Sequence, residues 1–318
     1  MKVKVAVIGA GGFANMMHFP SLKEIEDVEL CAVCDLIYER ARNTAEKFQI
    51  EKVYTDYKKM IEETAPDAVY IIVAPHHLFD VAFFCLSQGL NVFMEKPPGI
   101  TIHQAKRFAQ LAEQKGTITM VGFQRRYAPV MVEAKRRIDE RGGMVHCQAN
   151  FFKHHIGLPP YYEGAVDLLT CDVIHSLDTL RWMAGEPKKV KSIVKNNFAD
   201  YPNMFLALIE FDSGATGILS TNWTSGKRIY SVEMHGKGII AFADPEKEAV
   251  FFKDNSEEPE ILKTQEAAGS DELFKYAGFY FENKHFIECL KEKKQPATNL
   301  LDAYKTMEFV ELIYASTF

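Results

Sequence analysis

One helix-like segment in the middle of the chain carries residues that could move a proton. Asp172, His175 and Asp178 follow one another at three-residue spacing, so they are expected on roughly one face of a helix. A histidine with an adjacent carboxylate can act as a general base, because the carboxylate orients the imidazole. The same pattern also fits an ordinary helix whose histidine satisfies a hydrogen bond in the core.

A lysine in an unusual setting is the second candidate for chemistry. Lys96 follows the apolar residues 91–94 and lies between Glu95 and Pro97. A lysine held beside a substrate hydroxyl could hydrogen-bond it and help to move its proton while a hydride leaves the carbon. A solvated loop residue is the ordinary alternative for a lysine that precedes two prolines.

Two aromatic rings precede the helix that carries His175. His154 and Tyr161 flank a loop with glycine and two prolines, and such rings both stack and hydrogen-bond. They could shape a pocket for a polar, ring-shaped substrate, or be loop residues with no special duty. A divalent metal could also use His175 and its acidic neighbours. The spacing places no third convincing ligand, however, so we expect no metal.

The first residues of the chain have a pattern that could bind the molecule that takes up or supplies the hydride. Alternating valines in residues 3–7 predict a buried strand, and Gly9, Gly11 and Gly12 follow it. A strand that ends in glycines before a helix is typical of a dinucleotide-binding βαβ unit. Gly9 would make the tight turn, Gly11 would let the backbone approach a pyrophosphate, and Ala14 would let the helix pack on the strand. Taken alone, the pattern also fits a glycine turn in another α/β protein.

A carboxylate ends the second predicted strand. Asp35 lies about twenty residues beyond the glycines, where an acid hydrogen-bonds the hydroxyls of the adenosine ribose. An acid there repels a 2′-phosphate, so Asp35 favours NAD. NADP stays possible because Arg40 and Arg42 follow on the next helix, where they equally fit solvated charges. Asp35 itself could instead cap that helix.

Strands and helices alternate regularly in the first part of the chain. Apolar strands over residues 67–73, 91–94 and 119–122, each preceded or followed by a helix, predict a parallel sheet with both faces covered. Ligands of such sheets bind at the carboxyl ends of the strands. The loop after residue 73, the Glu95-Lys96 pair and Arg125 all follow such strand ends.

The second part of the chain has a different rhythm. Most segments beyond residue 144 resemble strands joined by short turns, with one helix over residues 167–183 and two closing helices over 272–293 and 301–315. We therefore predict two domains. Residues 1–123 form an α/β Rossmann dinucleotide-binding domain. Residues 124–318 form an α+β domain with a largely antiparallel, open-faced sheet, whose last helices could pack back on the first domain.

Composition and charge exclude several classes of protein. The chain has 318 residues and a formal net charge of −6, whereas nucleic-acid binding requires a basic face. It contains no apolar stretch of bilayer length and does not begin with a signal-peptide pattern, so we expect no membrane partner. The six cysteines are spread over several predicted elements, with Cys31 and Cys34 inside one apolar strand, which fits buried thiols in a reducing cytoplasm.

Together these residues resemble the Gfo/Idh/MocA family, which includes glucose–fructose oxidoreductase and inositol dehydrogenase. The similarity rests on the glycine fingerprint at residues 9–14, Glu-Lys-Pro at 95–97, Gly-Phe-Gln-Arg-Arg-Tyr at 122–127 and His-Ser-Leu-Asp at 175–178. These motifs come in the family's order and span nearly the whole chain. Three positions depart from the pattern. Cys171 stands where the family usually has its catalytic aspartate, His76 stands in place of the usual asparagine, and Phe79 stands where many members have histidine.

The resemblance implies a role for each matching residue. Lys96 and His175 would be the catalytic pair, with Asp172 in place of the usual acid. The expected cofactor contacts are Gly9, Gly11, Gly12, Phe13, Ala14, Asp35, Ala74, Pro75, His76, Glu95 and Lys96. The expected substrate contacts are Arg125, His154, Tyr161 and Asp178.

The resemblance also implies an activity. We expect an NAD(P)-dependent oxidoreductase that moves a hydride between nicotinamide and a carbinol or carbonyl carbon of a sugar, cyclitol or related polyhydroxy substrate. A homodimer or homotetramer would form through the open face of the second sheet. Two alternatives remain: a catalytically silent, dinucleotide-binding regulatory protein, which Cys171 would explain, and a lyase or hydrolase that uses tightly held NAD transiently.

Overall fold

The computed structural model describes residues 2–318, so that Met1, where the predicted first domain begins, lies outside the described residues. The chain divides into two compact units. The first comprises Met1–Phe123 and Phe279–Tyr304, and the second comprises Gln124–Gly278 and Lys305–Phe318. Among the described residues, no helix combines the length and apolar character that crossing a membrane requires.

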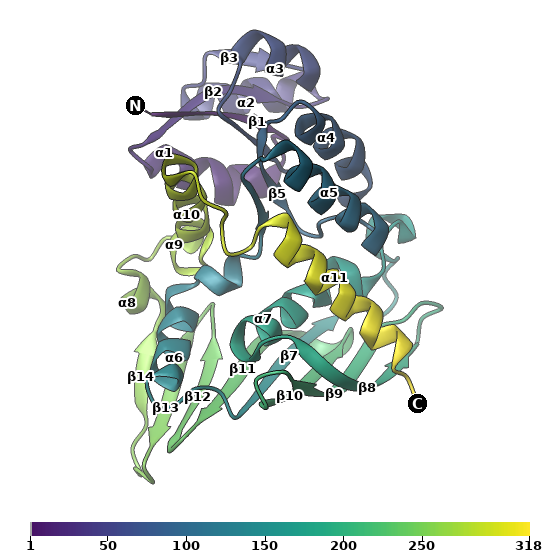
Figure 1. Cartoon of the computed structure of the whole chain (residues 1–318), viewed down its shortest axis with the longest axis vertical. Coiled ribbons are helices and arrows are strands. Elements are labelled where there is room, and N and C mark those ends of the chain that lie inside the picture. Colours follow the sequence, from purple (N-terminus) through teal and green to yellow (C-terminus); the bar gives the residue numbers. More distant parts are fainter. Residues whose placement is uncertain (1) are drawn as a thin grey trace. The chain divides into compact units, whose positions relative to one another are not determined.

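The first unit is built on a six-stranded parallel sheet (Figure 1). The strand order is β3 (Lys52–Tyr54), β2 (Val28–Cys34), β1 (Val3–Ile8), β4 (Ala68–Ile71), β5 (Asn91–Glu95) and β6 (Thr119–Gly122). This is the order of a Rossmann fold, with its switch point between β1 and β4. All four residues of β4 are fully buried, as expected for a strand covered on both faces. The predicted Rossmann fold is confirmed.

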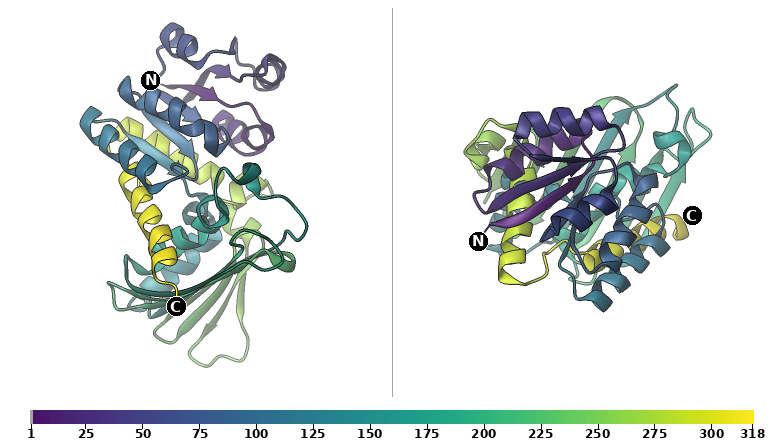
Figure 2. Two further views of the ribbon diagram at one scale, coloured as in Figure 1. Left: turned by 90° about the vertical axis from the view of Figure 1, so that its right-hand side faces the viewer. Right: turned by 90° about the horizontal axis from the view of Figure 1, so that it is seen from above.

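Helices pack on this sheet from both sides (Figure 2). They are α1 (Phe19–Glu24), α2 (Tyr38–Phe48), α3 (Tyr57–Thr64), α4 (Pro75–Ser87), α5 (Ile102–Lys115) and α10 (Phe279–Glu292). A π-helical turn over Ala14–His18 leads into α1. The late helix α10 belongs to this unit because Phe286 packs against Tyr70 and Phe93, with ring centroids 5.7 and 5.8 Å apart. A division of the chain at residue 123 alone would count it with the second unit.

The second unit is built on an eight-stranded sheet. The strand order is β14 (Glu260–Lys263), β13 (Glu248–Lys253), β12 (Ile239–Asp244), β11 (Thr224–Gly236), β7 (His146–His154), β10 (Thr216–Asn222), β9 (Met204–Phe211) and β8 (Pro187–Lys195). The described neighbours pair antiparallel except β7 and β10, which run parallel. The predicted α+β class is thereby confirmed.

One face of this second sheet is covered by helices. α7 (Ile174–Ala184) packs on β7 and β10, and α6 (Pro129–Asp139) packs on β11, β12 and β13. The end of α11 (Leu300–Ala315) reaches β8, where Ser192 Oγ donates to the carbonyl of Ile313 at 2.5 Å. Along β9, Phe205 is fully buried while Leu208 is 63 % exposed, because successive side chains point to opposite faces. No described helix covers the face that carries Leu208 (Figure 2).

Two predicted helices differ from the observed ones. The helix expected over residues 272–293 is broken into α9 (Leu273–Tyr276) and α10 at Gly278. Gly278 has a φ of +100°, and a Cβ added there would lie 2.3 Å from the carbonyl oxygen of Gln124. The helix expected over residues 167–183 starts with a π-helical turn, Leu169–Val173, before α7.

Candidate active site

The turn after β1 has the geometry that a dinucleotide phosphate needs. Gly9 has a φ of +107°, and a Cβ there would lie 2.0 Å from the carbonyl oxygen of Ile72, so only glycine fits. At Gly11 and Gly12 an added Cβ would meet no described atom within 4 Å. The fully buried Ala14 then lets the helix pack on the strand. The loop therefore offers open backbone to a pyrophosphate.

Asp35 lies at the carboxyl end of β2 with one backbone partner on each oxygen. Its Oδ2 accepts from the N–H of Ala10 at 2.8 Å, and its Oδ1 accepts from the N–H of Ile37 at 2.9 Å. Each oxygen keeps a lone pair for a ribose hydroxyl. Arg42 pairs with Glu39 and Glu46 of its own helix, so its charge is already partly neutralised. This arrangement favours NAD over NADP.

Four further predicted cofactor residues lie in the loops and first helical turns that follow strands of this sheet. α4 begins at Pro75, after Ala74 and the short loop that follows β4, and His76 is exposed in its first turn. Phe13 is 43 % exposed and meets the ring of Phe279 edge-on at 5.5 Å. These residues remain predicted contacts of the cofactor.

Glu95 lies beneath the backbone of Lys96. Glu95 is 9 % exposed, and its Oε1 lies 2.8 Å from Nε2 of His18 while its Oε2 accepts from the N–H of Lys96 at 3.2 Å. A Cβ at Gly122 would lie 2.8 Å from Glu95 Oε1, so the glycine leaves room for the carboxylate. The buried carboxylate of Glu95 therefore fixes the backbone of Lys96, whose side chain is half-buried.

Glu282 of α10 joins this buried group and was missed from the sequence. It is fully buried, and neither of its oxygens has a hydrogen-bond partner among the described residues. Ligand atoms of Glu282, Glu95 and His18 all lie within 4.8 Å of one another. Burial, together with the charge of Glu95, raises the pKa of Glu282 well above its usual value. The sequence held one signal, an acid on the helix face shared by Phe279 and Phe286.

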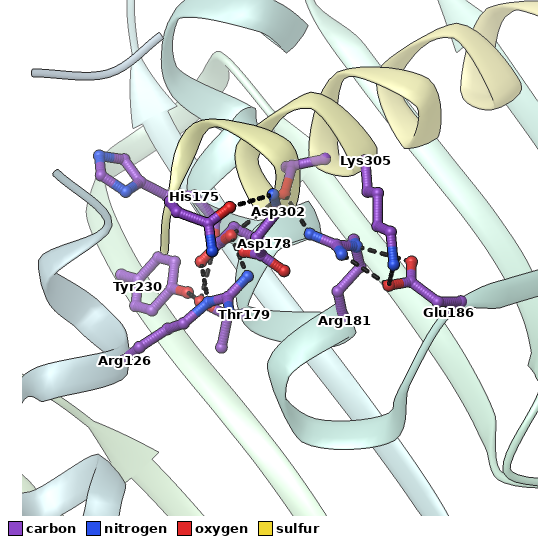
Figure 3. A network of polar contacts seen from close by, with 11 residues as sticks. Arg126, His175, Asp178, Thr179, Arg181, Glu186, Tyr230, Asp302 and Lys305 are labelled. Carbon is purple, nitrogen blue, oxygen red and sulfur yellow. Dashed lines mark hydrogen bonds and ion pairs between the residues drawn. The ribbon is translucent and has the colours of Figure 1, made fainter. Parts of the chain in front are cut away.

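His175 lies in the first turn of α7 and is 6 % exposed. Thr179, one turn later, donates from Oγ1 to the carbonyl of His175 at 2.7 Å and hydrogen-bonds the hydroxyl of Tyr230 at 2.9 Å (Figure 3). Tyr230 comes from β11, so the sheet fixes the turn that carries the histidine.

Asp172 is ion-paired with Lys153 of β7. Lys153 Nζ also donates to the hydroxyl of Tyr161 at 3.2 Å, and Trp223 Nε1 donates to the same oxygen at 3.1 Å. Burial and the charge of Asp172 raise the pKa of Tyr161. The structure thus brings Asp172 and Tyr161 together through Lys153. Nothing in the spacing of the sequence pointed to Lys153.

Asp178 was predicted to contact substrate, and the structure gives it another role. It is 1 % exposed, and both its oxygens accept from Arg126, one of them from Nε at 2.7 Å (Figure 3). Thr306 Oγ1 donates to it as well, at 3.2 Å. A buried carboxylate with these partners stabilises the packing of α7, while a contact of Asp178 with substrate stays a prediction.

Arg125 and His154 were also predicted to contact substrate, and they lie on opposite sides of the second sheet. The Arg125 guanidinium stacks 3.4 Å from the ring centroid of Tyr230, on the helix-covered side of the sheet. His154 ends β7, where strand alternation puts it on the opposite face from Lys153, and its Nδ1 lies 3.1 Å from the carbonyl oxygen of Ser225. Arg125 therefore lies with the Asp172 cluster, whereas His154 does not.

Two family models match this chain. Residues 3–123 match the oxidoreductase family with an NAD-binding Rossmann fold, and residues 163–240 match the GFO/IDH/MocA C-terminal domain. The chain belongs to the GFO/IDH/MocA family. The resemblance inferred from the sequence motifs is confirmed, and so is the expected enzyme class. This GFO/IDH/MocA protein is an oxidoreductase with NAD as its cofactor.

Several relatives align with the GFO/IDH/MocA chain over nearly its whole length. A scyllo-inositol 2-dehydrogenase (NAD(+)) of Bacillus subtilis is 27 % identical, with 96 % of this chain and 92 % of the relative covered. A myo-inositol 2-dehydrogenase of Thermotoga maritima is 25 % identical, with 93 % and 91 % covered. The matches give no support to the catalytically silent alternative.

Solved structures share the fold. A dehydrogenase from Chromobacterium violaceum superposes with a TM-score of 0.89 at 21 % identity, covering 99 % of this chain and 95 % of that one. A levoglucosan dehydrogenase in complex with NADH gives a TM-score of 0.86 at 18 % identity, covering 99 % and 97 %.

Proposed function

We propose that this enzyme is an NAD-dependent dehydrogenase of a sugar, cyclitol or related polyhydroxy compound, acting at a CH–OH group. The observation that carries the proposal is the open glycine turn beside Asp35, in a chain whose family is an NAD-binding oxidoreductase family. Relatives named for inositol dehydrogenation support the substrate class.

The proposed cofactor residues fit a dinucleotide along the carboxyl ends of β1, β2, β4 and β5. Gly9, Gly11, Gly12, Phe13 and Ala14 would hold the pyrophosphate, and Asp35 the ribose. Ala74, Pro75, His76, Glu95 and Lys96 would follow the cofactor towards its nicotinamide. A dinucleotide held there would supply the hydride acceptor or donor of the reaction, at its nicotinamide.

The proposed catalytic residues handle the proton. In the oxidation direction His175 accepts the proton of the substrate hydroxyl while the carbon loses its hydride, and the C–O bond becomes a carbonyl. Lys96 would hydrogen-bond a substrate hydroxyl, and its buried neighbour Glu95 fixes its backbone. Asp172, paired with Lys153, would orient the hydroxyls of the substrate together with Tyr161.

Replacing Lys96 by methionine tests the assignment. The Lys96→Met variant should bind NADH with nearly unchanged affinity and lose turnover by at least about 100-fold, the size of a typical general acid–base contribution. The exposed Lys106→Met on α5 is the matched control and should keep full turnover. The screen should cover sugars, sugar acids and inositols with NAD and NADP in parallel. Full turnover by Lys96→Met would contradict the role of this lysine.

We further infer a homodimer or homotetramer that forms through the uncovered face of the second sheet. This face carries the exposed apolar side chains of Leu208, Phe242 and Ile261, which are 63, 40 and 50 % exposed. Apolar side chains exposed together on one face are typical of a protein–protein interface. A Leu208→Asp variant should lower the mass measured by light scattering, while the equally exposed Leu301→Asp on α11 should not. An unchanged mass for Leu208→Asp would reject this interface.

We place the protein in the cytoplasm. The supporting observation is that Cys31, Cys34, Cys85, Cys147 and Cys289 are free thiols in the described chain, as a reducing compartment maintains them. Fractionation of cells should recover the protein with cytoplasmic markers.

A further inference from the structure

The second unit gathers positive charge around one buried aromatic ring. Phe151 of β7 is 1 % exposed. Three cations lie near its centroid: Arg125 at 4.9 Å, Lys153 at 5.1 Å and Arg228 at 5.7 Å. Cations favour the faces of aromatic rings, but three of them in one place repel one another unless acids neutralise them.

Only two of these cations have an acid. Lys153 is paired with Asp172, and Arg228 is paired with Glu246 at 2.6 Å. Arg125 is the exception. It is 6 % exposed, no carboxylate of residues 2–318 lies within ion-pair distance of it, and its Nη1 is buried without a hydrogen-bond partner.

A buried guanidinium without an acid is unfavourable, because burial removes its hydration. Burial and the charge of Arg228 both lower the pKa of Arg125, in line with that cost. Stacking on Tyr230 at 3.4 Å offsets part of it. Stacking also occupies a face of the guanidinium and leaves Nη1, at its edge, as a donor without a partner. The edge of a guanidinium matches the two oxygens of a carboxylate.

The Nη1 atom of Arg125 lies in the same unit as the proposed catalytic residues Asp172 and His175. The hydroxyl of Tyr230, on whose ring Arg125 stacks, bonds Thr179, and Thr179 bonds the carbonyl of His175. Asp172 is close enough for its charge to act on Arg125. A group bound by Arg125 would therefore be part of the molecule on which His175 acts.

We propose that Arg125 binds a carboxylate of the substrate, and that the preferred substrate is a polyhydroxy acid of the sugar-acid type. The proposal rests on the dehydrogenase function proposed above and narrows its substrate class. A neutral sugar or cyclitol would leave the guanidinium unpaired.

Matched pairs of substrates test the proposal. Reduction of NAD should be measured with D-gluconate against sorbitol and with D-glucuronate against D-glucose, and glucose 6-phosphate should be added to separate phosphate from carboxylate. We expect the acids to have the higher kcat/KM. Arg125→Met should lower kcat/KM for the acids by roughly 10- to 100-fold, mainly through KM, the size of a lost charge-assisted hydrogen bond. The neutral partners should change little. Arg228→Met, which removes a paired cation near the same ring, is the control and should spare both classes.

Several outcomes would overturn the assignment. They are turnover of neutral sugars as efficient as that of acids, an equal loss for acids and neutral partners in Arg125→Met, and a preference for the phosphate ester. A thermal-shift titration of the NADH-loaded enzyme with D-gluconate keeps the two proposals apart. If nothing turns over but D-gluconate stabilises the wild type and not Arg125→Met, the carboxylate site stands and the dehydrogenase function fails. If neutral sugars turn over and no acid binds, the function stands and the carboxylate site fails.

Discussion

Glu282 should make the stability of the first unit fall as the pH rises. Its side chain is fully buried without a hydrogen-bond partner, and this burial, together with the charge of Glu95, holds its pKa well above the usual value for a glutamate. The folded protein therefore keeps a proton that the unfolded chain releases. This contribution to stability is fully present below the pKa of the unfolded chain and is lost as the pH rises towards the folded pKa.

The Glu282→Gln substitution isolates this effect, because glutamine has the same shape and no proton to lose. One pH unit corresponds to about 1.4 kcal/mol for one proton. As the pH rises towards the folded pKa of Glu282, the free energy of unfolding of the variant should therefore increase relative to that of the wild type, by at most about this amount for each pH unit. Urea unfolding should be followed by circular dichroism, since both tryptophans, Trp182 and Trp223, lie in the second unit.

The control for this experiment is Glu288→Gln on the same helix. Glu288 is 52 % exposed and lies 3.9 Å from Lys284, so its loss should shift the stability little and equally at each pH. The buffers should contain EDTA, because His18, Glu95 and Glu282 could also hold a divalent cation in place of the proton. Parallel stability curves for wild type and Glu282→Gln from pH 5.5 to 7.5 would refute a protonated Glu282.

Three further substitutions test the site. Gly9→Ala should lower the free energy of unfolding by about 2–4 kcal/mol and abolish NADH binding, because its methyl would collide with the Ile72 carbonyl; thermal melts and NADH fluorescence measure both. Asp35→Ala should weaken NADH binding by about 1–2 kcal/mol and so reduce the difference between the affinities for NADH and NADPH. Titration of the variant with each cofactor would measure both affinities. Lys153→Met should lower the free energy of unfolding by about 1–3 kcal/mol, since Asp172 loses its counter-ion, and the added Asp172→Asn should restore part of it in a urea double-mutant cycle.

Most of the fold could be predicted from patterns over short stretches of the sequence. Alternating or continuous apolar runs predicted the strands of the Rossmann sheet, because a strand buried on one or both faces has a recognisable pattern of apolar residues over only a few positions. Gly9 could be assigned for the same reason, since a tight turn constrains the residue that makes it. The break at Gly278 could not be predicted, because the collision that demands glycine there involves Gln124, far away in the sequence.

Partners between distant elements were the part that the sequence did not reveal. The spacing grouped Asp172 and Asp178 with His175 on one helix, but it did not reveal that Arg126 binds Asp178 and that Lys153 binds Asp172. The sequence places Glu282 on an apolar helix face, but its position next to Glu95 depends on the tertiary fold.

The assignment of Phe279–Tyr304 to the first unit has a consequence for the order of synthesis. The six strands of the first sheet are complete once residue 122 has been made, but α10 follows only after roughly another 160 residues. At translation rates of about 5–20 residues per second, the growing chain waits about 8–32 s for this helix. During that time Tyr70 and Phe93 lack the packing of Phe286. Nascent chains of this protein should therefore expose an apolar surface that chaperones bind until the last quarter of the message has been read.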